Sequence, residues 1–217
     1  MQTSLLRPYF RYAGLPVEKF AEPHFELTPE IVVQLRQMDY FHQWKACIEN
    51  GWHHVLLEDL SFFSFSNLNE RPSYSYSPCP LEIESFRTFL LLRDLEPSRS
   101  NRDAYKEEYQ LALETASLKE HLSPIRYDVD PHGYEPATHP VAHIHIGLNN
   151  QIRIGTRRLI TPIAFVLFVI RQFFPDNWRN LLQYQAELKI ERNIRTKLSL
   201  IDQQFWSQED ELQMYLQ

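Results

Sequence analysis

The sequence predicts an α+β fold, with a mainly antiparallel sheet of about five or six strands flanked by helices. Two helix starts of the form Thr-Pro, at Thr28 and Thr161, bracket a middle region rich in short strand candidates. Regular βαβ alternation is missing, which favours an antiparallel sheet. Hydrophobic content of 43% and charged content of 23% are typical of a globular chain. We expect one domain over 1–217, and the pattern leaves open whether the C-terminal helical segment, 175–217, is semi-independent.

Helices are predicted before, within and after the strands. Apolar residues recur at helical spacing from Ile31 to Ile48 and end at Asn50-Gly51, which predicts one first helix. A second helix is expected over about 105–116. Thr161-Pro162 opens a third, which is apolar nearly all round to Phe174 and should be buried. After Pro175 a further helix is expected, with an apolar stripe that packs on the body or on a partner helix: Ile194, Leu198, Ile201 and Phe205.

Strands are predicted from alternation and from turn residues. The aromatic segments 61–66 and 73–77 are separated by a polar turn and predict a β-hairpin. The segment 83–92 is compatible with strand or helix. Further strands are expected at 125–129, 141–147 and 151–154.

Charge and hydropathy limit the classes of function. The net charge is −6, yet residues 151–200 hold nine basic residues against three acidic ones. Such asymmetry suits an anionic ligand, an acidic protein partner or the chain's own acidic half. The longest apolar run, 163–170, is far shorter than the roughly 20 residues that span a bilayer. We therefore expect a cytoplasmic protein that does not enter membranes.

Four of the nine histidines fall in the short stretch from His132 to His145. His143 and His145 alternate with isoleucines, so both should point to one face of a strand. A three-residue loop, 148–150, pairs His145 with Arg153 and places the isoleucines on the opposite face. This register predicts that His143, His145 and Arg153 share one surface.

That surface suggests acid–base chemistry on a phosphodiester. Two neutral imidazoles can serve as general base and general acid near pH 7. A guanidinium binds phosphate bidentately and stabilises charge in the transition state. We expect the catalytic set to be His143, His145, Arg153 and Asp128, with Asp128 supporting an imidazole. Substrate contacts are expected from His139, Arg126, Tyr127, Arg157 and Arg158. A solvated polar face without chemistry is the alternative.

A metal site is the competing chemical interpretation. His143 and His145, with a third ligand from His139, Asp128, Asp130 or His132, would leave an open coordination position. An arginine directly opposite His145 would repel a divalent ion, and the spacing matches neither an HExxH helix nor a zinc finger. We therefore expect no metal and no cofactor.

Several spaced motifs occur in order between about 120 and 180, namely RYDVDP, HPVAHIHIG, RI and TPIAFVLF. In these motifs the chain resembles an uncharacterised prokaryotic conserved family of unknown function. The resemblance implies a small prokaryotic protein of the kind found beside mobile-element, toxin–antitoxin or phage-defence genes. By analogy alone, it raises the expectation of a nuclease or a nuclease-associated subunit.

The leading hypothesis is a metal-independent phosphodiesterase or ribonuclease-like protein of a defence or toxin–antitoxin system. Its substrate would be nucleic acid, RNA in preference to DNA, or another anionic phosphoester. One alternative is a non-catalytic subunit of such a complex that binds a protein partner through the C-terminal helix. The other is a His/Asp metallohydrolase.

Overall fold

The computed structural model describes residues 3–21, 27–68, 71–148 and 152–216. Within these ranges the strands form one eight-stranded sheet in which the spatial order follows the chain order. Neighbouring strands are antiparallel, except that β8 is parallel to β7. The strands are β1 (Val17–Phe20), β2 (Val55–Leu57), β3 (Phe62–Leu68), β4 (Arg71–Ser77), β5 (Ile125–Val129), β6 (Ala142–Ile146), β7 (Ile152–Thr156) and β8 (Tyr215–Leu216). The α+β class and the antiparallel character are confirmed, but there are more strands than predicted.

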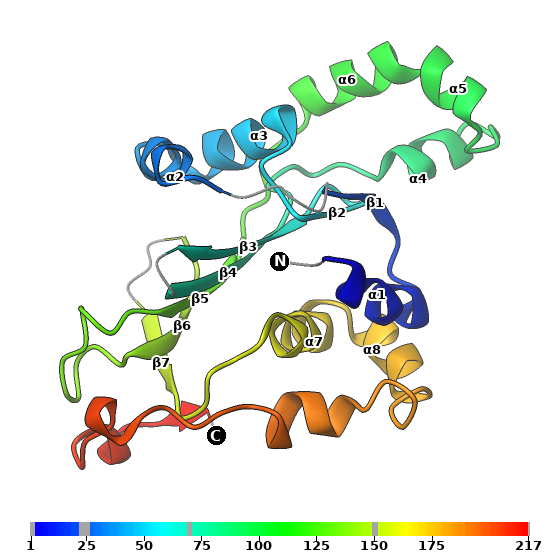
Figure 1. Ribbon diagram of the computed structural model, residues 1–217. Helices are drawn as coiled ribbons and strands as arrows, with labels where there is room; N and C mark the ends of the chain where they lie inside the picture. The colour runs from blue at the N-terminus through cyan, green and yellow to red at the C-terminus, as the bar shows by residue number, and fades with distance from the viewer. Residues whose placement is uncertain (1–2, 22–26, 69–70, 149–151, 217) are drawn as a thin grey trace.

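Helices cover both faces of this sheet (Figure 1). On one face lie α1 (Arg7–Ala13), α7 (Pro162–Phe173) and α8 (Pro175–Leu182). On the other lie α2 (Pro29–Arg36) and α3 (Tyr40–Asn50), and α4 (Phe86–Leu91), α5 (Arg99–Ala104) and α6 (Lys106–Thr115) continue from that layer. None of the helices in the described ranges has the length and apolar character that crossing a membrane requires.

The main core lies between the sheet and α7. As predicted, α7 is buried over most of its surface, and its Thr161 caps the helix by accepting a hydrogen bond from the Ala164 N–H. Phe63 and Phe65 of β3 meet the Phe165 ring edge-to-face, with centroids 6.5 Å apart in both pairs. Tyr127 and Ile144 complete this apolar face and are almost fully buried. The opposite face of the same strands is therefore free to carry polar side chains.

One helix prediction is wrong in extent, and one segment left open between strand and helix is helical. The expected helix over 29–50 is two helices, because Asp39 accepts a hydrogen bond from the His42 N–H and starts α3. The segment 83–92 is helical over α4, where Ser85 provides the cap. The second predicted helix, 105–116, is confirmed as α6, with the separate α5 before it.

The C-terminal stripe is not one helix. It comprises a π-helical turn, η2 (Arg192–Thr196), an irregular stretch and a 3₁₀ turn, η3 (Gln203–Phe205). Leu198 and Ile201 are buried, and Ile201 belongs to the main core cluster. The stripe thus packs on the body of this chain, which is the first of the two predicted alternatives. Two further 3₁₀ turns are η1 (Thr3–Leu6) and η4 (Asp210–Leu212).

Candidate functional site

The polar face of the sheet is built by strand alternation. Ile144 points to the core, so His143 and His145 on either side of it point to the opposite face. His145 pairs with Arg153 of β7, as the predicted register requires, and with Arg126 of β5 on its other side. Of the predicted loop 148–150, residues 149–150 lie outside the described residues. Three adjacent strands therefore present an arginine, a histidine and an arginine at directly paired positions.

Beside this row lies a second row of paired residues. Asp128 of β5 pairs with His143 of β6, which pairs with Gly155 of β7. Asp128 also pairs with Ser73 of β4, whose hydroxyl donates to Asp128 Oδ1 at 2.7 Å. A β-carbon at Gly155 would lie 3.3 Å from the Pro140 side chain, so the glycine leaves room for Pro140 beside His143.

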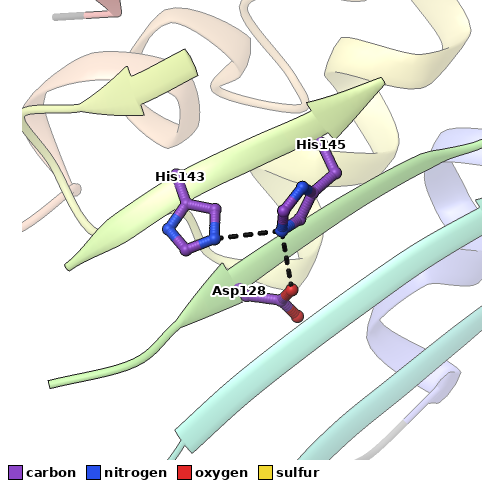
Figure 2. A group of neighbouring side chains, drawn as sticks. All are labelled: Asp128, His143 and His145. Atoms are coloured by element: carbon purple, nitrogen blue, oxygen red, sulfur yellow. Dashed lines mark hydrogen bonds and ion pairs between the residues drawn. The ribbon is translucent and has the colours of Figure 1, made fainter. Parts of the chain in front are cut away.

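Asp128, His143 and His145 converge on one point (Figure 2). His143 Nε2 and His145 Nε2 lie 3.0 Å apart, and His145 Nε2 lies 3.4 Å from Asp128 Oδ2. The two rings are perpendicular, with an interplanar angle of 84°. Because both interacting nitrogens are the ring tips, the two imidazoles form a unit with Asp128 and cannot act through Nε2 on separate atoms of a substrate.

The proton on His143 is placed by its backbone partner. His143 Nδ1 lies 2.7 Å from the Pro140 carbonyl oxygen, which can only accept, so Nδ1 carries the hydrogen and Nε2 presents a lone pair. Burial lowers the pKa of His143 to about 4 from 6.5. His143 is therefore neutral near pH 7, and its tautomer is fixed.

Asp128 is ionised. Burial alone would raise its pKa, but the hydrogen bond with His145, the charge of Arg126 and the Ser73 hydroxyl outweigh that effect and hold the pKa well below 3.8. Arg126 Nε donates to Asp128 Oδ2 at 2.6 Å. The carboxylate thus brings a negative charge to the buried rings of His143 and His145.

Both histidines are buried, at 2% and 3% exposure for His143 and His145, whereas a shared surface was predicted. Helices α2 and α3 lie on this side of the sheet (Figure 1), and their side chains line a cleft with His145, whereas His143 lies against His139 and Pro140, which precede β6. The cleft between this helical layer and the sheet has a volume of about 450 Å³, and His145 and Arg126 lie in its wall. The other lining side chains include Met38, Tyr40, Gln43, Trp44, Trp52, Ser64 and Ser75.

Three of the predicted substrate-binding residues lie away from this cluster. Tyr127 points to the apolar face, is fully buried, and accepts a hydrogen bond from the Ile160 N–H, because it alternates with Asp128 on the strand. Arg157 and Arg158 donate to the backbone carbonyls of Ile201 and Leu198, respectively, and so fasten the C-terminal segment. The structure thus places these three side chains in structural contacts outside the cluster around His145.

His139 and Arg126 are brought to the site. The His139 ring centroid lies 5.0 Å from that of His143, and His139 Nδ1 contacts the Gly133 carbonyl oxygen. Arg126 is partly exposed and faces the cleft. Arg153 is exposed at the neighbouring strand. These three residues surround the buried unit.

Sequence reasoning missed two groups that position the unit, Ser73 and the Pro140 carbonyl. Ser73 could have been found from the sequence, since serines alternate with tyrosines in the segment 73–77 and so share one face of β4. The Pro140 carbonyl has no such sequence signal, because its direction depends on the bend of the chain before β6.

A family model described as "Uncharacterized conserved protein (DUF2290)" matches residues 22–215. The chain belongs to this family. The match confirms the resemblance to an uncharacterised conserved family, and the DUF2290 region contains every side chain of the site. No curated protein matches the sequence, and no solved structure matches it.

Proposed function

We propose that this DUF2290 protein is a cytoplasmic phosphodiesterase of the nuclease type, acting on RNA in preference to DNA. The observation that carries the proposal is the row Arg126–His145–Arg153 on three adjacent strands, backed by Asp128 and His143. Guanidinium groups on both sides of an imidazole provide a site for one phosphodiester anion.

The residues divide into two roles. Arg126 and Arg153 bind the non-bridging phosphate oxygens and stabilise the charge that develops in the transition state. Asp128, His143 and His145 activate the attacking oxygen as a unit, since their polar atoms already contact one another. This replaces the separate acid and base expected from the sequence by one activating centre. The cleft beside Arg126 and His145 admits the substrate.

The test is hydrolysis of bis(p-nitrophenyl) phosphate and of a single-stranded RNA oligonucleotide. We expect Arg153→Gln to lower kcat/KM by about 10- to 100-fold, because one donor to the phosphate is lost. Arg153→Lys keeps the charge but lacks the planar guanidinium, so its kcat/KM should lie between those of the wild type and Arg153→Gln. Arg195→Gln, at an exposed position of η2, is the matched control and should retain full activity. A wild-type protein that cleaves neither substrate, or an Arg153→Gln variant with unchanged kcat/KM, refutes the proposal.

A second candidate is a non-catalytic subunit of a defence or toxin–antitoxin complex. It is favoured by Leu212 and Met214 near the C-terminus, which are apolar and 88% and 92% exposed. Stoichiometric co-purification of one protein partner that is lost in a Leu212→Ser/Met214→Ser variant, without hydrolysis of either substrate, would support this candidate over the first.

A further inference from the structure

We propose that Asp128, His143 and His145 together bind one divalent first-row transition-metal ion, such as zinc or iron(II). The inference supplies the activating group for the cleavage proposed above and in that respect rests on it. Ion binding is measured without substrate, however, so the two proposals can fail separately.

The separations between the three donor atoms fit a shared ion. Metal bonds to imidazole nitrogen and carboxylate oxygen are about 2.0–2.2 Å long, so two ligands of one ion lie about 2.9 Å apart at a right angle and about 3.4 Å apart at the tetrahedral angle. The observed separations are 3.0 Å between the two Nε2 atoms and 3.4 Å from His145 Nε2 to Asp128 Oδ2. All three donor atoms lie within 4.8 Å of one another.

Two of the three ligands are held by outer groups in the arrangement that metal sites use. His143 donates its other ring N–H to the Pro140 carbonyl oxygen, which aims the Nε2 lone pair at the centre of the cluster. Asp128 Oδ1 accepts from the Ser73 hydroxyl, which fixes the carboxylate and leaves Oδ2 facing the histidines. All three ligands lie on paired strands rather than on loops, so the pairing of β5 with β6 fixes their relative positions.

Two nitrogens and one carboxylate oxygen define the kind of ion. Imidazole favours zinc, iron and related ions, whereas magnesium and calcium prefer oxygen ligands. Three protein ligands leave at least one position open for water or a phosphate oxygen. The cleft that reaches His145 provides the path by which the ion and the substrate enter.

Arg126 and Arg153 are compatible with this ion. Arg126 Nε binds the same carboxylate oxygen as the proposed ion, but each carboxylate oxygen has two lone pairs. Arg153 is exposed, so water screens its charge, and the charge of Arg126 is balanced by the Asp128 carboxylate that it binds. An ion between two arginines gives the site a net positive charge, which suits an anionic phosphodiester.

The experiment is a cobalt(II) titration of the full chain, purified without a His tag and stripped with a chelator. We expect one equivalent to bind, with the visible absorption of cobalt held by nitrogen and oxygen ligands, and one equivalent of zinc to displace it. His143→Gln and Asp128→Asn should each lose this binding. His132→Gln, at an exposed histidine of the same segment, should bind cobalt as the wild type does.

Ser73→Ala provides a variant that keeps all three ligands. Loss of an outer hydrogen bond to a ligand weakens metal affinity by about 10- to 100-fold, so this variant should bind one equivalent with that lower affinity. Wild-type protein that binds no cobalt, or ligand variants that bind as well as the wild type, overturns the site. Phosphodiester cleavage that persists in metal-stripped protein overturns the role of the ion. One bound equivalent without cleavage supports the site and refutes only the proposed function.

Discussion

His53 should make the protein sensitive to acid. It lies between α3 and β2, is 2% exposed and contacts the Phe62 ring with centroids 6.0 Å apart. Its Nδ1 has no hydrogen-bond partner among the described residues. Burial, with a smaller contribution from the charge of Lys19, lowers the pKa of His53 from 6.5 to about 4. The folded protein therefore holds a neutral ring at a pH where the unfolded chain holds a charged one.

The direction of the pH effect on stability follows from proton uptake. Between about pH 6.5 and 4 the unfolded chain binds a proton at His53 that the folded protein does not bind, so stability falls as the pH falls through this window. At pH 4.5 the linkage relation gives a loss of about 2–3 kcal/mol relative to pH 7.5. For one buried side chain, this is a large part of the stability of a typical domain.

The assay is urea unfolding at pH 7.5 and pH 4.5, in the presence of a chelator, for the wild type and for His53→Leu. Leucine fills a similar space and cannot titrate. We expect the difference in unfolding free energy between the two pH values to be about 2–3 kcal/mol smaller in the variant. His143, which also has a lowered pKa, is present in both proteins, so its contribution cancels. His121→Leu, at an exposed position, should behave as the wild type does. If His53→Leu loses as much stability between the two pH values as the wild type, the reasoning is wrong.

Two further predictions concern the loop between β5 and β6. A β-carbon at Gly133 would lie 2.5 Å from Asp130 Oδ2, so Gly133→Ala should lower the unfolding free energy by about 1–3 kcal/mol, and an unchanged urea midpoint would contradict this. Asp210 is fully buried and accepts hydrogen bonds from the Tyr134 hydroxyl and the Ala137 N–H, which ties the C-terminus to this loop. Asp210→Asn should lower the unfolding free energy by about 1–3 kcal/mol and make the C-terminus susceptible to limited proteolysis. Protease resistance equal to that of the wild type would show that these hydrogen bonds do not hold the C-terminus in place.

The local features of the site could be predicted from the sequence. Alternation on β6 placed His143 and His145 on one face, and the segregation of isoleucines identified Arg153 as the partner of His145. Both inferences use the two-residue period of a strand, which depends only on neighbouring residues. The same period, applied to β5, separates Tyr127 from Asp128, so only one of the two side chains can lie on the face of the histidines.

Contacts between distant segments could not be predicted in this way. The short strands β1, β2 and β8 exist because they pair with neighbours, and two to four residues carry too little pattern to be recognised alone. The break between α2 and α3 had a local signal in Asp39, since aspartate is a favoured cap, but the apolar spacing on either side masked it.

The sequence by itself determined the faces of the strands, the cap-and-proline start of α7 and the burial of α7, because each follows from residues close together in the chain. Only the tertiary structure decided that Asp128 lies beside the two imidazoles, that both rings are buried, and that Arg157 and Arg158 bind the C-terminal segment. Those outcomes depend on which strands pair and which helical layer closes over the sheet. Both are settled by the burial of apolar surface from segments more than a hundred residues apart, such as Phe63 and Phe165.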